Sequence, residues 1–272
     1  MGIELAVALR RLEEEGSTGV LRAGDGSFHL TRGAIVSADC RRTTGLDRLV
    51  VEAGVATAED WQRAGSGDPG RVLAQPQLET LALLSVFDAA YFLLASATTP
   101  EFEPAPEHWL APVCHIKPGL LVNECARRGD PDAGPWPAEA VDRAPVLPVR
   151  RVRRRRVALS GGQTEVLATA DGRRTVADIA RELGRTSYGC LVAVRDLTVA
   201  ELIQPADVTR SPAASAPPSP AQPSPPPSEP AVAPPLVRRR RSVTSVASQE
   251  HWESPVDIDV LVRLRAALEE LE

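Results

Sequence analysis

The side chains in this chain that could bind a metal ion through sulfur or imidazole are four cysteines and four histidines. Of these, Cys114, His115 and Cys125 lie closest together in the sequence. A structural zinc site commonly uses two close ligand pairs, and adjacent Cys and His side chains cannot both reach one ion without distorting the backbone. The chain has no Cys-x-x-Cys pair, so we expect two partly buried cysteines, a surface histidine and no metal site.

Nucleophilic or acid–base catalysis is also poorly supported by the sequence. Cys40 precedes Arg41 and Arg42, and cationic neighbours favour a thiolate, although a quiet cysteine at the end of a strand is the simpler interpretation. His29 falls in an expected strand and His108 in an acidic loop. Neither histidine belongs to a nucleophile motif such as Gly-x-Ser-x-Gly, so an enzyme is only a remote alternative.

Phosphate-binding loops are also missing from the pattern. Gly24 and Gly26 lie between two expected strands, without the helix and the lysine that must follow in a phosphate cradle. Lys117 is the only lysine of the chain, which excludes a Walker-type site. We therefore expect no enzymatic activity and no cofactor.

The strongest chemical signal is a run at residues 150–156, in which six of seven positions are arginine. Such a cluster could neutralise phosphates and would give salt-dependent affinity for DNA. Two further arginines lie at the start and in the interior of a helix that follows, but this helix offers few other side chains that read base edges. The candidates for nucleic-acid binding are Arg150, Arg151, Arg153, Arg154, Arg155, Arg156, Arg185 and Arg195.

Residues 254–272 have the pattern of a short amphipathic helix. Ser254 is suited to be its N-cap and Pro255 to its first turn, and apolar residues then recur at spacings of three and four. An isolated helix of this length is marginal in water, so the apolar stripe needs a surface on this chain, on a second copy or on another protein. The partner-binding candidates are Ile258, Leu261, Leu264, Leu268 and Leu271.

An α+β region over residues 1–130 is expected to come first. Leu5, Leu9 and Leu12 share one face of an opening helix. Three short antiparallel strands joined by glycine turns are expected at residues 20–22, 28–30 and 34–36. Further helices are expected at residues 43–52, 57–64 and 78–97, the last of which is apolar except for Glu79 and Asp88.

The second half of the chain is expected to hold a smaller module between two connecting segments. Residues 131–149 are punctuated by proline and glycine, which indicates a linker. Residues 150–205 are expected to form a small winged-helix-like α domain. Its expected elements are a strand at 157–159, a helix at 162–170, and two helices that form a helix-turn-helix around Gly184. Residues 206–253 are rich in Pro, Ser and Arg and are expected to be a disordered linker before the terminal helix.

Composition and charge restrict the class of protein. A length of 272 residues and 43% hydrophobic content suit about two folded domains. Residues 1–149 carry 13 basic and 21 acidic side chains, net −8, whereas residues 150–205 carry 11 and 6, net +5. Only this middle segment would attract a polyanion. The charged residues within the longest apolar stretch argue against a membrane span, and no signal-peptide pattern is evident, so we expect a cytoplasmic protein.

Two stretches resemble known families. The segments 16–21, 28–30 and 33–38 resemble PATAN-type domains of bacterial regulatory proteins, whose Gly-x-Ile-x-x-Ala hairpin is matched by Gly33, Ile35 and Ala38. The resemblance implies a protein-interaction domain without catalytic residues. Residues 157–205 are similar to winged helices of the MarR-like type, through the segment 175–184. The preference for arginine over lysine resembles that of actinobacterial proteins.

Together these patterns favour a non-enzymatic cytoplasmic regulator or scaffold that acts through protein–protein contacts. A DNA-binding transcriptional regulator that uses the arginine run and the winged-helix-like module is the alternative. The expected partner is a protein, DNA is a second possibility, no membrane is involved, and a homodimer is compatible with the pattern.

Overall fold

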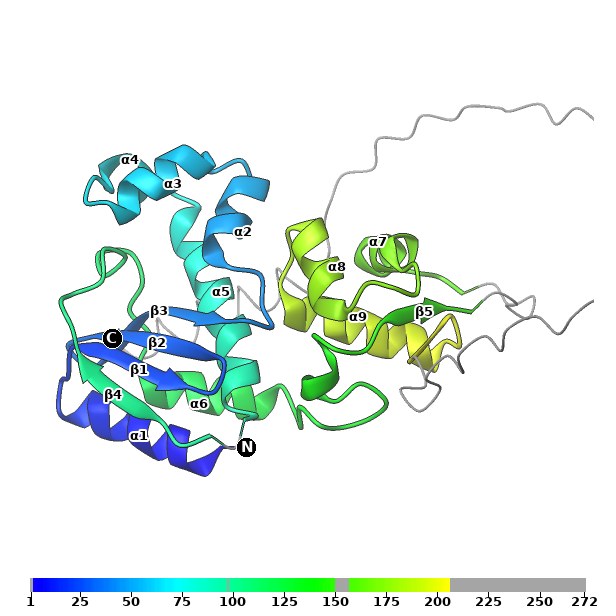
Figure 1. Ribbon diagram of the computed structural model, residues 1–272, viewed down its shortest axis with the longest axis horizontal. Coiled ribbons are helices and arrows are strands. Elements are labelled where there is room, and N and C mark those ends of the chain that lie inside the picture. Colours follow the sequence, from blue (N-terminus) through cyan, green and yellow to red (C-terminus); the bar gives the residue numbers. More distant parts are fainter. Residues whose placement is uncertain (1, 97, 150–156, 206–272) are drawn as a thin grey trace, which may run out of the picture. The chain divides into compact units, whose positions relative to one another are not determined.

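The computed structural model describes residues 2–96, 98–149 and 157–205, which belong to one compact unit ending at Asp207 (Figure 1). The amino-terminal region is α+β, with a small antiparallel sheet and helices packed on it, as the sequence predicted. A module of three helices and two short strands follows. The expected disordered linker and terminal helix, residues 206–272, lie outside the described residues.

The chain opens with α1 (Ile3–Glu14), which buries Leu5, Leu9 and Leu12 on one face. The strands β1 (Gly19–Ala23), β2 (Gly26–Thr31) and β3 (Ala34–Cys40) then form the two expected hairpins. Gly33 has a φ of 81°, and a Cβ there would lie 2.7 Å from the carbonyl oxygen of Glu13. The second turn therefore requires glycine both for its backbone conformation and for its approach to α1.

A fourth strand completes the sheet, which has the order β3-β2-β1-β4. This strand, β4 (Glu101–Pro104), pairs antiparallel with β1, so that Phe102 lies opposite Leu21. The sequence did not predict it, because β4 is short and mostly exposed and has no run of apolar side chains, only Phe102 and Pro104 beside two glutamates. Its position depends on β1 rather than on its own pattern.

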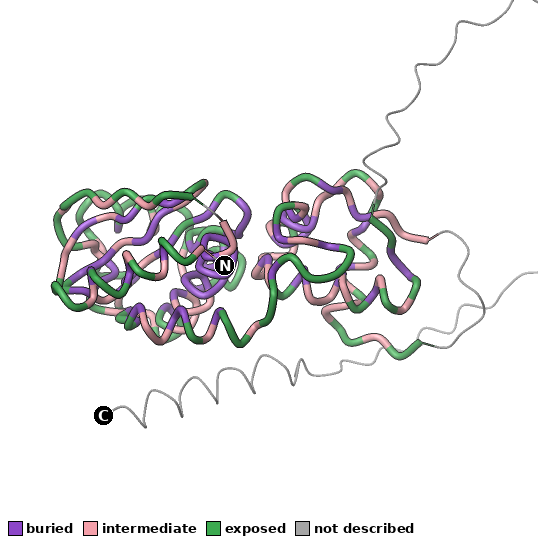
Figure 2. Tube along the Cα trace, turned by 90° about the horizontal axis from the view of Figure 1, so that it is seen from below, coloured by how far each residue is buried: buried purple, intermediate pink, exposed green. Residues whose placement is uncertain are grey.

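Five helices complete the α+β region. They are α2 (Leu46–Glu52), α3 (Ala58–Gly65), α4 (Gly70–Leu73), α5 (Leu78–Leu93) and α6 (Pro118–Arg127). Thr57 caps α3 through a capping box, with Asp60 as its second member. Helix α5 is buried along most of its length and packs against β3, α2 and α6, while α6 also packs against α1 (Figure 1). Buried residues run through the interior of this region (Figure 2).

Residues 131–149, expected to be a linker, carry both a one-turn helix and a strand. They contain η1 (Ala138–Ala140) and β5 (Val146–Pro148). Trp136 and Val141 are fully buried, and the Trp136 Nε1–H donates to Thr198 Oγ1 at 2.9 Å. This segment therefore packs into the module that follows it.

The helical module contains α7 (Gly161–Thr169), α8 (Val176–Leu183), α9 (Ser187–Val199) and β6 (Ile203–Pro205). The predicted helix pair is confirmed, with Thr175 capping α8 and Gly184 in the left-handed conformation at its end. The strand predicted at residues 157–159 is wrong, because the small sheet is made instead by β5 and β6. Next to this sheet, an isolated β-bridge pairs Pro145, which precedes β5, with Thr175, which lies between α7 and α8.

Among the described residues, no helix combines the length and the apolar character needed to cross a membrane.

Candidate functional site

The amino end of α9 is the feature that connects the helical module to the α+β region. Helix α9 begins after the N-cap Thr186, and its first residue, Ser187, is fully buried. Asp88 of α5 reaches this end, where Oδ2 accepts the backbone N–H of Ser187 at 2.8 Å and Oδ1 accepts that of Tyr188 at 2.7 Å. The first two N–H groups of a helix have no partner within it, and a carboxylate here also faces the positive end of the helix dipole.

Asp88 is almost completely buried, with 1% of its surface exposed. Burial raises the pKa of its carboxyl to about 6, even though the N–H groups of Tyr188 and Ser187 and the charge of Arg128 act in the opposite direction. The Arg128 guanidinium lies 4.6 Å from the ring centroid of Tyr188 and 5.4 Å from that of Phe87. The acid, the cation and two aromatic rings thus form one cluster between α5, the end of α6 and α9.

Arg195, a predicted phosphate contact, is used within the fold. Its Nη2 donates to the backbone carbonyls of Pro131 and Trp136, at 2.8 Å each, and Nη1 lies 3.5 Å from the hydroxyl of Tyr91. These bonds hold the segment 131–136 against α9. A guanidinium committed to two backbone carbonyls is poorly placed to neutralise a DNA phosphate, which weighs against this role for Arg195.

Arg185, the second candidate that the structure describes, is also engaged. Its Nη2 forms an ion pair with Glu165 at 3.0 Å, and its backbone carbonyl accepts a hydrogen bond from Thr44 Oγ1 at 2.7 Å. Arg185 lies in the turn before α9 and Arg195 lies within α9, and the structure does not bring them onto one open surface, since both contact neighbouring elements.

The other candidates lie outside the described residues. These are the arginine run, Arg150, Arg151, Arg153, Arg154, Arg155 and Arg156, and the apolar stripe, Ile258, Leu261, Leu264, Leu268 and Leu271. Their roles remain predictions.

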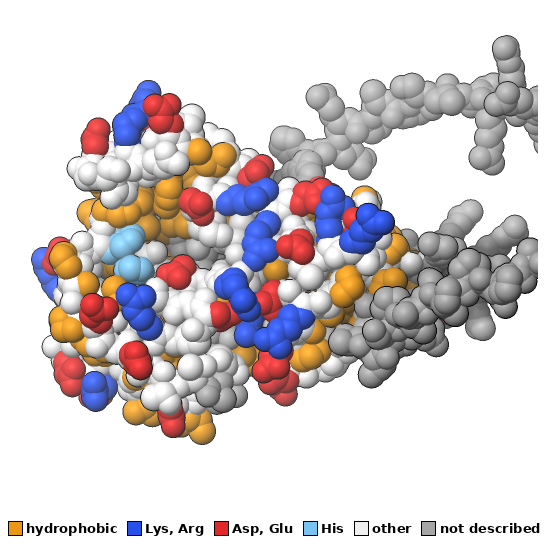
Figure 3. Space-filling view, viewed as in Figure 1, with side chains coloured by type: hydrophobic (Ala, Val, Ile, Leu, Met, Phe, Trp, Pro, Cys, Tyr) orange, Lys and Arg blue, Asp and Glu red, His pale blue; other side chains and the backbone are white. Residues whose placement is uncertain are grey.

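A second polar contact joins the two parts of the chain. Arg41 Nη2 lies 3.0 Å from Asp142 Oδ2, and Arg42 Nε lies 3.2 Å from Asp25 Oδ2 and 3.9 Å from Asp142 Oδ1. Arg181 of α8 donates to the backbone carbonyl of Arg41 at 2.5 Å. Figure 3 shows basic side chains interleaved with acidic ones on one face, a pattern that suits internal ion pairs better than a phosphate-binding surface.

Thiol and metal chemistry find no support among the described residues. The four cysteines are all buried and unpaired, and burial raises the pKa of each thiol to about 12. Cys40 lies at the end of β3, where the sequence placed it, and Cys114 and Cys125 are more deeply buried than expected. No group of three or more His, Cys, Asp or Glu side chains in these residues is placed to hold a metal ion.

The two histidines considered for catalysis lie together on the sheet. The rings of His29 and His108 are 4.6 Å apart, and burial lowers the pKa of both, that of His108 to about 4. The Nδ1 of His108 accepts the backbone N–H of Leu110 at 3.2 Å, and its ring stacks on Trp109. His108 therefore packs its loop onto the domain.

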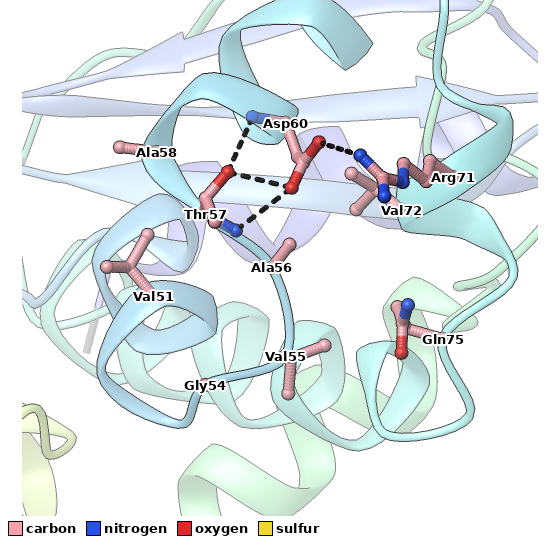
Figure 4. Close-up of a pocket in the computed structure, with 10 residues that line it drawn as sticks. All are labelled: Val51, Gly54, Val55, Ala56, Thr57, Ala58, Asp60, Arg71, Val72 and Gln75. Carbon is pink, nitrogen blue, oxygen red and sulfur yellow. Dashed lines mark hydrogen bonds and ion pairs between the residues drawn. The ribbon is translucent and has the colours of Figure 1, made fainter.

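A pocket of about 440 Å³ lies between α2, α3 and α4. Figure 4 shows that its charged groups bind one another, since Asp60 accepts hydrogen bonds from Thr57 and from Arg71, the latter at 3.1 Å. These bonds, led by the one from the Thr57 side chain, lower the pKa of Asp60. The lining is otherwise largely apolar, with Val51, Val55, Ala56, Ala58 and Val72. The pocket offers a hydrophobic surface rather than a catalytic acid or base.

Comparison of the chain with protein-family models, with curated proteins and with solved structures finds no match. Its function must therefore be argued from its own residues.

Three residues that form the contact between the parts were not singled out from the sequence: Arg128, Trp136 and Asp88. A signal existed for Asp88, because it is a lone carboxylate in the middle of an apolar helix, and such a group must find partners when it is buried. No comparable signal marked Arg128 or Trp136, since their partners lie far away in the sequence.

Proposed function

We propose that this chain is a non-enzymatic regulatory or scaffold protein that acts through protein–protein contacts. One observation carries the proposal. At the amino end of α9, with which a helix-turn-helix protein reaches base edges, Ser187 is fully buried and the Asp88 carboxyl of α5 accepts the backbone N–H groups of Ser187 and Tyr188. A negative charge and a covering helix at this position oppose entry into a DNA groove.

The architecture supports the same proposal. The resemblance of the amino-terminal region to PATAN-type domains implies an interaction module. The α+β fold, the confirmed hairpins and Gly33 at its turn are compatible with it. In the helical module, the α8–α9 pair flanked by β5 and β6 supports a winged-helix-like classification. Its small sheet uses a strand that precedes α7, a departure from a wing made after the second helix of the pair.

A DNA-binding regulator remains the second candidate, because of the six arginines at residues 150–156. The discriminating experiment is fluorescence anisotropy of the full chain with random duplex DNA at about 50 and about 200 mM salt, a range over which several phosphate contacts cause a large loss of affinity. The interaction proposal predicts weak binding or none at the lower salt. Tight binding with a steep salt dependence would favour the DNA-binding regulator.

A matched pair of variants sharpens the comparison. Replacement of the six arginines of the run 150–156 by alanine should abolish any DNA binding if that run contacts phosphates. The control replaces the second arginine run, residues 238–241, which has the same kind of charge at another place in the chain. Equal effects of the two replacements would indicate only nonspecific charge attraction.

The protein partner can be sought through the predicted tail stripe. Replacing Leu261, Leu264 and Leu268 together by serine removes the apolar face without changing the charge. The proposal predicts that a partner captured by the full chain is lost with this variant and retained when the 150–156 arginines are replaced. Retention of the partner by the serine variant would exclude the stripe as its binding surface.

A further inference from the structure

Buried polar atoms without a hydrogen-bond partner are unevenly distributed over the described residues. Of six such atoms, only Thr31 Oγ1 lies inside the sheet away from the helical module. The other five lie where the α+β region meets residues 131–205. Three of them, Asp25 Oδ2, Arg42 Nε and Asp142 Oδ1, lie in the ion pairs described above without forming a hydrogen bond. The other two, Ser187 Oγ and Arg195 Nε, have no hydrogen bond or ion pair, and a buried polar atom of this kind destabilises the arrangement that buries it.

The contact that contains these atoms combines the edge-to-face packing of Tyr91 on Tyr188 with several polar bonds. Thr44 donates to the backbone carbonyl of Arg185, Arg181 donates to that of Arg41, and Asp88 accepts two backbone N–H groups. Contacts between parts of one chain that are polar and incompletely satisfied resemble transient interfaces between proteins. Such contacts open more readily than a hydrophobic core.

We propose that the contact between α5 and α9 is a reversible closure, in which the Asp88 carboxyl holds the amino end of α9 and is the group whose protonation state sets how tightly it closes. Opening uncovers Ser187 and Tyr188, together with the aromatic face on which Arg128 lies. The closed state buries Ser187 and binds the first N–H groups of α9, at the end that faces outward in a helix-turn-helix protein, so the device is a partial internal occlusion of that helix end.

The direction of the pH effect follows from the state of Asp88 on each side of the equilibrium. In the closed state burial raises the pKa to about 6, whereas in the open state the group meets water and returns toward its ordinary value of 3.8. The closed state therefore binds the proton more tightly, so that closure is strongest at low pH and weakens as the pH rises through about 6. Between pH 5 and pH 7.5 these values correspond to about a tenfold increase in the fraction open.

Among the charged groups near Asp88, Arg128 is the one whose charge acts on the pKa of its carboxyl. Arg128, which follows α6, is cationic and lies close to Glu124. From α9, Tyr188 and Cys190 face the site; burial raises the pKa of both, so they stay neutral. Beside Tyr188, the Tyr91 ring of α5 lies 4.7 Å away between ring centroids, and its hydroxyl lies 3.5 Å from Arg195 of α9.

Amide hydrogen exchange of the full chain, measured by mass spectrometry between about pH 5 and pH 7.5 and corrected for the intrinsic exchange rates, tests the proposal. The protection of a peptide covering residues 184–192 should fall about tenfold as the pH rises. A peptide from β2 should not share this slope, because the opening is local. An equal slope in both peptides, or none at residues 184–192, would overturn the proposal.

Two variants assign the slope to Asp88. Asp88→Asn should abolish the pH slope at residues 184–192, whatever its effect on the level of protection. The control Asp178→Asn, which removes the cap carboxylate of α8 within its own helix, should keep the slope. If Asp88→Asn fails to fold, Arg128→Gln supplies the test, since loss of the cation should move the transition to higher pH. An unchanged midpoint in that variant, or a persisting slope in Asp88→Asn, would contradict the proposal.

Discussion

Replacing Arg195 by alanine should destabilise the fold without affecting any DNA binding. The wild-type guanidinium donates to two backbone carbonyls, of Pro131 and Trp136, at 2.8 Å each. A hydrogen bond from a charged donor contributes roughly 1.5–3 kcal/mol, but Arg195 Nε has no partner, and that buried atom already costs about 1–3 kcal/mol. Weighing the two bonds against this cost, we expect Arg195→Ala to lower the free energy of unfolding by roughly 2–4 kcal/mol.

Urea unfolding followed by tryptophan fluorescence measures this difference. The matched control is Arg173→Ala, because the Arg173 side chain is exposed and forms no hydrogen bond or ion pair with the described residues; it should change stability by less than about 0.5 kcal/mol. Arg195→Lys should give an intermediate loss, since one ammonium cannot reproduce the forked geometry. If Arg195→Ala behaves like the control, or weakens DNA binding at unchanged stability, the structural role assigned to Arg195 is wrong.

Four further predictions concern packing, capping and titration. Trp136→Ala should lower the free energy of unfolding by about 3–5 kcal/mol in urea denaturation, because a fully buried ring and its bond to Thr198 are lost; a loss below about 1 kcal/mol would show that residues 131–149 are not part of the core. Thr57→Ala should cost about 0.5–2 kcal/mol by the same assay through loss of the α3 cap, and an unchanged midpoint would show that the cap contributes nothing. The four cysteines should react with a thiol reagent at pH 8 only after unfolding, since burial raises the pKa of each to about 12; rapid reaction of the native protein would contradict this. His108→Asn should become progressively more stable relative to the wild type as the pH falls below 6.5, because the neutral wild-type imidazole must be protonated on unfolding; a pH-independent difference in unfolding free energy would refute this.

Local sequence patterns were sufficient to predict much of the secondary structure of the amino-terminal region. The helix carrying Leu5, Leu9 and Leu12 and the two hairpins were predicted because periodicity, glycine turns and caps all act within a few residues. The boundaries were less accurate: α2 begins at Leu46 rather than at residue 43, and α5 ends at Leu93 rather than at residue 97. Helix ends depend on tertiary contacts as well as on propensity.

Long-range pairing accounts for what the sequence did not predict. Strand β4 is paired with β1 across about 80 residues, and Trp136 is bonded to Thr198 of α9 across 62 residues. Proline and glycine in residues 131–149 correctly indicated irregular backbone, but irregular backbone can still be buried when its carbonyls find a donor such as Arg195. The contact between Asp88 and α9 is of the same kind, because the partners are about 100 residues apart.

Titration of Asp88 and of His108 between pH 4 and pH 6.5 changes the stability of the fold in opposite directions. Asp88 has a raised pKa, so its contribution to stability is present at low pH and is lost as the pH rises through about 6. His108 has a lowered pKa, so its burial destabilises the native state as the pH falls below 6.5 toward about 4. In global unfolding both groups are exposed and the two effects oppose each other. Opening at α9 exposes Asp88 but leaves His108 stacked on Trp109. The free energy of closure should therefore depend more strongly on pH than the free energy of global unfolding, in which the two effects oppose each other.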